Sequence, residues 1–335
     1  MSQEAVKSAE ARKPQTNGLT TIGLDLGGTK ILALAVELPS GEIVARRKVA
    51  TPRHAAATVE TLYEAAMVVA TDLGYLPNAV GVGAAGLIDI DGFIRTSPNL
   101  PDIDNLSLRE PFAARLGVPV ALENDATAAA VAEARLGAAK DSRNSLYVAF
   151  GTGIGGGLVI NGQVYRGAHG FAAEVGHMVI DPNGPVCGCG QKGCWEQLAS
   201  GNALGRLGQQ AFLEGRLKLA GGSDRLTNAE VTGELVGREA LAGNTTALGL
   251  LDIFSAEIAR GLANLTNVFD PEIIVVGGGV MELGEILLSP VRNHFQNLPM
   301  GAQHRPRVPI MHAHFGEDAG AIGAALLAAE LCELA

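Results

Sequence analysis

The sequence predicts an α/β protein built from two similar domains, and three observations support that prediction. The chain has 335 residues, a length typical of two domains and sufficient for a large core. Short apolar runs typical of buried strands alternate with longer stretches of helical periodicity. A glycine–threonine turn between two strand patterns occurs twice, with Thr152 lying 123 residues after Thr29. This repetition predicts an internal duplication, with two domains facing a shared phosphate across a cleft.

Composition and charge exclude several classes of protein. Hydrophobic residues make up 47% and charged residues 18%, as in ordinary globular proteins. A net charge of -10 and the lack of a basic stripe argue against a nucleic-acid partner. No apolar run reaches the roughly 18–20 residues of a membrane span. Residues 1–18 are polar and lack the apolar core of a signal peptide, so we expect a disordered tail and a cytoplasmic protein without a membrane partner.

The first elements form a strand, a tight turn and a second strand from Thr20 to Leu38, followed by a third strand at Glu42–Val49. Asp25 and the glycines of the turn lie on this hairpin, which lacks the spacing and the helix of a P-loop. Glycine turns expose backbone N–H groups that can bind phosphate oxygens, and Asp25 could hold Mg²⁺ directly or through water. A plain hairpin turn is the alternative interpretation.

Residues 58–73 have helical spacing, and Val80–Gly86 is a buried strand. Asn99 follows Pro98 in a loop signature, where its amide could face a ligand or bond its own backbone.

A strand at Val118–Leu122 leads into Glu123, Asn124 and Asp125, and an alanine-rich helix begins directly after them. Capping is the simplest role for Asn124 or Asp125, but α/β proteins also place catalytic groups at such strand ends.

The second glycine–threonine hairpin lies within Asn144–Tyr165, where Asn161 and Gly162 predict a type I′ turn. After it, Ser200–Gly243 predicts helices with loops, and Leu251–Phe269 predicts a long helix. A buried strand at Pro271–Val276 ends in a glycine triplet, which lets a flat ring or a phosphate approach the backbone. Arg307–Ala313 is a further strand, and Asp318 is expected to cap a C-terminal helix of small residues.

The stretch Glu174–Glu196 contains three of the four cysteines, at Cys187, Cys189 and Cys194. His177 lies in the same stretch, before the cysteines. One His and three Cys form a complete tetrahedral zinc set, and four protein ligands make such a zinc structural rather than catalytic. A reducing compartment disfavours the alternative of a disulfide plus a free thiol. A core histidine is the alternative for His177.

Several motifs together resemble the ROK family of sugar kinases, with bacterial glucokinases as the closest match. The resemblance covers about residues 20–330 in one order, and its most specific part is the run from Cys187 to Glu196. It implies a two-domain actin-like or hexokinase-like (ribonuclease H-like) α/β fold with duplicated domains and a structural zinc site. The expected domains are residues 19–124 with about 314–335, and residues 125–313 with the zinc motif 177–194.

The resemblance implies ATP-dependent phosphorylation of glucose at the 6-hydroxyl, with Asp125 as the catalytic base. A carboxylate can both orient the hydroxyl and accept its proton. The implied sugar-binding residues are Gly86, Asn99, Asn124, Asp125, Glu174, His177 and Glu196. The implied ATP- and Mg²⁺-binding residues are Asp25, Gly27, Gly28, Thr29, Lys30, Gly151, Thr152, Gly153, Gly277, Gly278 and Gly279.

Alternatives remain at this stage. Lys30 could be a solvated lysine at a strand end. The sugar could be N-acetylglucosamine, N-acetylmannosamine, mannose or fructose, and polyphosphate could replace ATP. A sugar-sensing regulator without turnover is a further alternative, against which Asp125 and both hairpins argue. The family suggests a homodimer or homotetramer.

Overall fold

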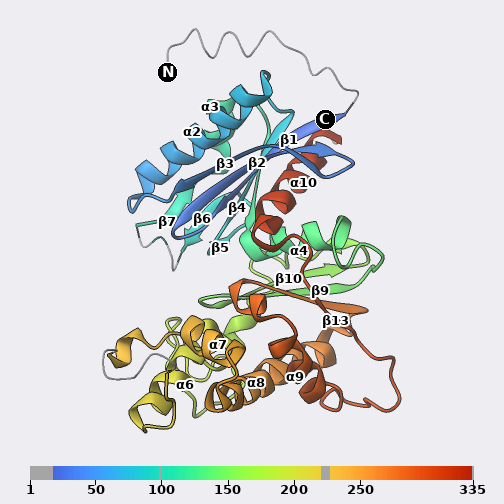
Figure 1. Ribbon diagram of the computed structural model, residues 1–335. Helices are drawn as coiled ribbons and strands as arrows, with labels where there is room; N and C mark the ends of the chain where they lie inside the picture. The colour runs from blue at the N-terminus through green and yellow to red at the C-terminus, as the bar shows by residue number, and fades with distance from the viewer. Residues whose placement is uncertain (1–17, 98–99, 101, 220–226, 334–335) are drawn as a thin grey trace. The chain divides into compact units, whose positions relative to one another are not determined.

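The computed structural model describes residues 18–97, 100, 102–219 and 227–333, and these form two compact units (Figure 1). Among the described residues, unit 1 contains those up to Arg143, the segment Gly157–Ala173 and those from His314 onward, and unit 2 contains Asn144–Gly156 and those within 174–313. The expected boundary at Asp125 differs from this division, because helix α4 (Asp125–Arg135) belongs to unit 1.

The centre of unit 1 is a five-stranded sheet with the order β3-β2-β1-β4-β8. Its strands are β1 (Leu19–Leu26), β2 (Lys30–Leu38), β3 (Glu42–Ala50), β4 (Ala79–Ala84) and β8 (Val120–Asn124). The first three strands pair antiparallel, and β4 and β8 run parallel to β1. The three consecutive strands predicted for the start of the chain are therefore confirmed. A smaller sheet contains β5 (Leu87–Ile88), β6 (Phe93–Thr96) and β7 (Asp104–Ser107).

Helices cover both faces of the first sheet because successive side chains of a strand point to opposite faces. One set of β2 side chains (Ile31, Ala33, Ala35) packs in a core with residues of α2 (Ala55–Leu73) and α3 (Arg109–Leu116). The other set (Leu32, Leu34, Val36) packs with residues of α4 and of α10 (Ala319–Glu333).

Helix α10 lies very close to both the sheet and α4. A Cβ added at Gly23 or Gly81 would lie 1.8 or 1.9 Å from a carbonyl oxygen of α10. A Cβ at Gly323 of α10 would lie 1.7 Å from the carbonyl oxygen of Ala128 in α4. The small residues of these elements therefore allow backbone to pack against backbone, which is why α4 belongs to unit 1.

The second five-stranded sheet has the order β11-β10-β9-β12-β13. Its strands are β9 (Ser145–Phe150), β10 (Ile154–Ile160), β11 (Gln163–Val164), β12 (Ile273–Gly277) and β13 (Ile310–His312). Asn161 and Gly162 have φ angles of 55° and 78°, as the predicted type I′ turn requires. If the strands of each sheet are numbered by their position along the chain, their spatial order across the sheet is third, second, first, fourth, fifth in both sheets. This shared order is the pattern expected from a duplication.

Helices make up most of the rest of unit 2. They are α5 (Glu196–Ala199), α6 (Gly201–Leu213), α7 (Gly233–Leu241), α8 (Thr245–Phe269) and α9 (Glu285–Phe295), with short 3-10 helices η1 (Val175–His177), η3 (Asn228–Glu230) and η4 (Gly279–Leu283). Helix α8 begins before the predicted Leu251 because the Asn244 side chain caps it, accepting hydrogen bonds from the N–H groups of Thr246 and Ala247.

The predicted cap of α10 is wrong. Asp318 ends the 3-10 helix η5 (Gly316–Asp318), and Arg46 on β3 takes one oxygen of its carboxylate in an ion pair. The other oxygen has no hydrogen-bond partner among the described residues, so the side chain does not bond the first turn of the helix.

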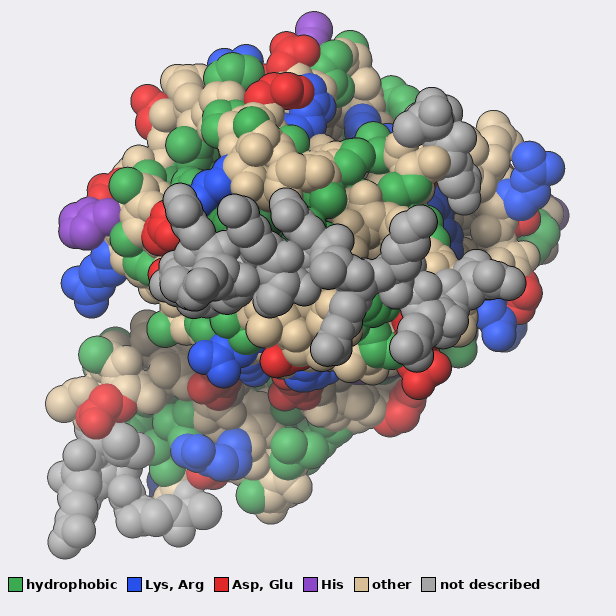
Figure 2. Space-filling model, turned by 90° about the horizontal axis from the view of Figure 1, so that it is seen from above, with side chains coloured by type: hydrophobic (Ala, Val, Ile, Leu, Met, Phe, Trp, Pro, Cys, Tyr) green, Lys and Arg blue, Asp and Glu red, His purple; other side chains and the backbone are tan. Residues whose placement is uncertain are grey.

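Two surface properties bear on the possible partners. Within the part of the chain that the structure describes, no helix has the length and apolar character needed to cross a bilayer. Figure 2 shows acidic, basic and apolar side chains interspersed over the face that it displays, without a continuous basic stripe among the described residues.

Candidate functional site

The first glycine hairpin lies in unit 1 between β1 and β2. The N–H of Gly27 donates to the carbonyl of Lys30 at 3.0 Å, which closes the turn. Thr51, which sequence reasoning did not single out, donates its hydroxyl to the carbonyl of Gly27 at 2.7 Å, and its N–H to the carbonyl of Thr29 at 3.0 Å. Gly28 and Thr29 are exposed, so the tip of the turn is accessible to a ligand.

Two carboxylates of unit 1 interact electrostatically near this hairpin. Burial raises the pKa of Asp25 from 3.8 to about 7, and the charge of Asp125 adds to that rise. Gly83 on β4 lies opposite Asp25 in the sheet, and a Cβ on it would contact the Cα of Asp125 at 3.6 Å. Gly320 in the first turn of α10 also leaves room for the Asp25 carboxylate. Two neighbouring acids in a desolvated setting favour a cation.

Asp125 is the first residue of α4, and one of its carboxylate oxygens accepts the N–H of Ala126 at 2.8 Å. The side chain is half-buried by surface area, but its carboxyl is closely surrounded by protein atoms. This desolvation raises its pKa. A raised pKa makes a carboxylate a better proton acceptor near neutral pH.

Asn124 has the capping role that its position predicted. Its side-chain oxygen accepts the N–H of Thr127 at 3.0 Å, and its amide nitrogen donates to the carbonyl of Gly86 at 3.1 Å. Gly86 has a φ of 129°, and a Cβ there would lie 2.2 Å from the carbonyl oxygen of Thr96. The structure therefore brings Gly86, Asn124 and Asp125 together within unit 1. Asn99 lies outside the described residues.

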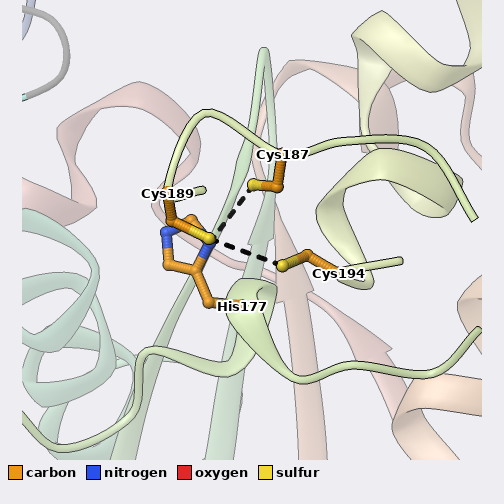
Figure 3. A group of neighbouring side chains, drawn as sticks. All are labelled: His177, Cys187, Cys189 and Cys194. Atoms are coloured by element: carbon orange, nitrogen blue, oxygen red, sulfur yellow. Dashed lines mark hydrogen bonds between the residues drawn. The ribbon is translucent and has the colours of Figure 1, made fainter. Parts of the chain in front are cut away.

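The four predicted metal ligands form one cluster in unit 2 (Figure 3). The ligand atoms of His177, Cys187, Cys189 and Cys194 all lie within 4.8 Å of one another. The Nδ1 atom of His177 is 3.6 Å from Sγ of Cys187, and Sγ of Cys189 is 3.6 Å from Sγ of Cys194. A tetrahedral zinc centre has edges of about 3.6 Å between N and S and about 3.8 Å between two S atoms.

This geometry excludes the disulfide alternative, since a disulfide needs sulfur atoms about 2.05 Å apart. All four cysteines are free thiols in the structure. Burial and the neighbouring thiols raise the pKa of Cys194 to about 12. The thiolate form of Cys194 is therefore unfavourable without a nearby cation, and the donor set of three sulfur atoms and one imidazole suits a soft divalent metal.

Trp195 anchors the segment that follows the last cysteine. It is fully buried, its indole N–H donates to the carbonyl of Glu257 in α8 at 2.8 Å, and its ring meets Phe150 edge-on at 5.5 Å. A Cβ at Gly261 of α8 would lie 1.9 Å from this ring. The cluster is therefore attached to the longest helix of unit 2.

Glu196 joins the cluster of His177 and the three cysteines to the second glycine hairpin. One carboxylate oxygen accepts the N–H of Ile154 at 3.1 Å, directly after the turn, and the other lies 3.9 Å from Sγ of Cys187. A Cβ at Gly153 would lie 2.3 Å from the Glu196 carboxylate. The N–H of Gly201 also donates to the carbonyl of Gly151 at 2.8 Å.

The glycine triplet contacts the same hairpin. Gly277 ends β12, and Gly278 has a φ of 84°, which favours glycine. A Cβ at Gly278 would lie 2.5 Å from the carbonyl oxygen of Phe150, the residue before Gly151. The structure therefore brings together both glycine motifs of unit 2.

The remaining acid, Glu174, is exposed and precedes η1, and its carbonyl accepts the N–H of His177 at 3.1 Å. The residue before it, Ala173, has a φ of 69°. This conformation costs a non-glycine residue about 1–2 kcal/mol, and the sequence contains no signal for it.

Lys30 makes an ion pair with Glu317 at 2.5 Å and is 39% exposed. Lys30 is therefore paired with a counter-charge and is not a freely solvated lysine. Sequence reasoning treated Glu317 only as part of the start of α10, because the contact spans 287 residues.

Curated sugar kinases resemble this chain over most of its length. It is 38% identical to the glucokinase of Streptomyces coelicolor over 317 residues, which cover 92% of this chain and 98% of that protein. It is 34% identical to the N-acetylmannosamine kinase of Citrobacter koseri over 311 residues, covering 92% and 99%. A ROK family glucokinase from Streptomyces griseus, solved in complex with glucose and AMPPNP, matches with a TM-score of 0.82 at 38% identity, covering 93% of this chain and 99% of that one.

The fold and these relatives define a hexose kinase. The ROK family model matches residues 21–331, and the chain belongs to the ROK family. The resemblance read from the motifs is confirmed, as is the α/β fold of hexokinase-like type.

Proposed function

We propose that this protein transfers the γ-phosphoryl group of ATP to the 6-hydroxyl of glucose, giving glucose 6-phosphate and ADP. The observation that carries the proposal is the carboxylate of Asp125 at the amino end of α4, with a pKa raised by desolvation. Support also comes from the glucokinase relatives and from a structural neighbour that holds glucose and AMPPNP.

Asp125 would act as the general base. The N–H of Ala126 donates to one of its oxygens, and the carboxylate would accept a further hydrogen bond from the sugar hydroxyl. As the hydroxyl oxygen attacks the γ-phosphorus in line, its proton passes to the carboxylate, and the bond to the ADP oxygen breaks. Because the pKa of Asp125 is raised, the carboxylate accepts this proton more readily than an ordinary aspartate.

The residues proposed to contact the sugar are Gly86, Asn99, Asn124, Asp125, Glu174, His177 and Glu196. With Nδ1 of His177 facing Cys187, the Nε2 atom on the other side of the ring would donate to a sugar hydroxyl. Carboxylates and amides suit a polyol because they accept hydrogen bonds from neighbouring hydroxyls.

The proposed nucleotide contacts are the two glycine hairpins and the glycine triplet. Backbone N–H groups around Gly28, Thr29 and Thr152 would bind phosphate oxygens, and Gly277–Gly279 would lie near the adenosine. Asp25 would hold Mg²⁺, whose charge would offset the repulsion between Asp25 and Asp125. When bound, Mg²⁺ would neutralise the negative charge that develops on the phosphate oxygens.

The metal of the Cys and His cluster is proposed to be a structural Zn²⁺. Four protein ligands complete a tetrahedral shell, so the ion would have no open position for catalysis. It would instead hold His177 and Glu196 in place. The cytoplasmic location of the protein and its assembly into a homodimer or homotetramer remain predictions.

The proposal is tested by measuring ADP release over a panel of hexoses. Glucose is expected to be the best substrate; a clear preference for N-acetylmannosamine would favour the second candidate, which the Citrobacter koseri relative suggests. Asp125→Asn should abolish turnover, a loss of about 10²-fold or more for a general base, while glucose binding measured by calorimetry survives. Near-normal turnover of this variant would remove Asp125 from the base role.

A further inference from the structure

Glu317 is the counter-charge of two lysines next to the first glycine hairpin. Its carboxylate lies 2.5 Å from Nζ of Lys30 and 3.0 Å from Nζ of Lys48. Lys30 begins β2 directly after the Gly27–Thr29 turn. Lys48 on β3 pairs with Leu32, two residues along from Lys30, so both lysines point to the same face of the sheet. Glu317 reaches that face from η5, just before α10.

The surrounding charges make Glu317 the shared acid of a basic group. Arg46 on β3 lies 3.9 Å from Glu317 and also pairs with Asp318. The hydrogen bond from Lys30, with that from Lys48, lowers the pKa of Glu317 to about 2, so this acid is ionised at any physiological pH. In these ion pairs, the two acids Glu317 and Asp318 therefore offset the charges of three cations, which are Lys30, Arg46 and Lys48.

We propose that Glu317 is an internal counter-anion that competes with the nucleotide phosphates for Lys30 and Lys48. It pairs with both lysines in the absence of nucleotide and releases them when the nucleotide phosphates bind. This competition sets the affinity for nucleotide. The inference rests on the proposed use of ATP. It assigns Glu317 a positioning role, because the residue acts through the lysines and does not touch the substrate.

The exchange is physically reasonable because the pairs are exposed. The side chains of Lys30, Lys48 and Glu317 are 39%, 48% and 48% exposed. Exposed ion pairs contribute little net stability, so breaking them is inexpensive. A nucleoside triphosphate carries several charges and also meets the exposed backbone of Gly28 and Thr29, so it competes well for the same lysines. While it remains nearby, the Glu317 carboxylate opposes every phosphate that binds, including those of ADP.

The decisive variant is Glu317→Gln, which keeps the shape and removes the charge. We expect calorimetry with AMPPNP and Mg²⁺, without hexose, to show about three- to tenfold tighter binding, the size expected from removing one nearby, half-exposed charge. The KM for ATP should fall in parallel, and the KM for glucose should not change. Unchanged or weaker AMPPNP binding would overturn the inference. Misfolding cannot produce a gain of affinity.

Two controls separate the possible causes. Glu330 lies in α10, shortly after Glu317 in the chain, and pairs with Arg135 instead of with the lysines. Glu330→Gln should therefore leave AMPPNP binding at the wild-type value. In a Lys30→Ala/Lys48→Ala background, Glu317→Gln should lose most of its effect, because the lysines it competes for are gone; a full gain there would contradict the mechanism. Wild-type protein that does not bind AMPPNP would instead refute the proposed function.

Discussion

The carboxylate of Glu196 accepts a hydrogen bond from the backbone N–H of Ile154 at 3.1 Å. Glu196 lies two residues after the last cysteine of the proposed metal site, and Ile154 begins β10 directly after the second glycine hairpin. A Cβ at Gly153 would lie 2.3 Å from the same carboxylate, so a larger residue there would require the Glu196 side chain to move. The acid that the motif assigns to the sugar therefore also holds the turn assigned to ATP.

Glu196→Ala is accordingly expected to weaken nucleotide binding as well as hexose binding. The amide of Ile154 would lose its acceptor, which costs about 1–3 kcal/mol of unfolding free energy if it stays buried. Steady-state kinetics should show a higher KM for ATP and for glucose, and thermal denaturation a lower Tm. Glu234→Ala, at an exposed acid in the first turn of α7, is the matched control. An unchanged KM for ATP would contradict the link.

A second variant tests the same contact from the other side. Gly153→Ala should lower the Tm in wild-type protein and cost much less in the Glu196→Ala background, because the clash involves that carboxylate. Gly249→Ala, where a Cβ meets nothing within 4 Å, is the control. Equal costs in both backgrounds would show that the two residues are independent.

Removal of the metal should destabilise unit 2 and expose reactive thiols. Elemental analysis is expected to find about one zinc per chain. After chelation, the Tm should fall, and a thiol reagent should modify Cys189 first, because Cys187 and Cys194 are buried. Since burial raises the pKa of Cys194 to about 12, rebinding of zinc at neutral pH should release protons. A metal-free protein with full activity and an unchanged Tm would refute the zinc assignment.

Asp25 is expected to make the ligand-free protein less stable as the pH rises. Its pKa in the folded state is about 7 and its usual value is 3.8, so the folded protein binds the proton more tightly. The stabilisation is complete below about pH 4 and is lost as the pH approaches and passes about 7. Asp25→Asn removes the charge and should therefore raise the Tm at pH 8 more than at pH 5.

Thermal denaturation at the two pH values measures this difference, with exposed Asp91→Asn as the control. Binding of AMPPNP and Mg²⁺ should be weaker in Asp25→Asn, in keeping with the proposed metal role. A Tm that changes equally at both pH values would show that the carboxylate is not responsible.

Local sequence determined the parts of this protein that depend on neighbouring residues. The glycine turns, the Asn161–Gly162 hairpin and the cap at Asn124 follow from backbone preferences and short-range hydrogen bonds. The metal ligands could also be named, because Cys187, Cys189 and Cys194 lie within eight residues of one another and their spacing has few other uses. The family followed from these motifs together.

Tertiary structure alone decided which distant groups meet. The pair of Lys30 and Glu317 spans 287 residues, and nothing in the local sequence of either residue indicates the other. The place of α4 in unit 1 follows from Gly323 of α10 packing on Ala128, a contact visible only once both helices lie on one sheet. The raised pKa of Asp25 likewise comes from burial and from the charge of Asp125, which are properties of the folded surroundings and not of the residue itself.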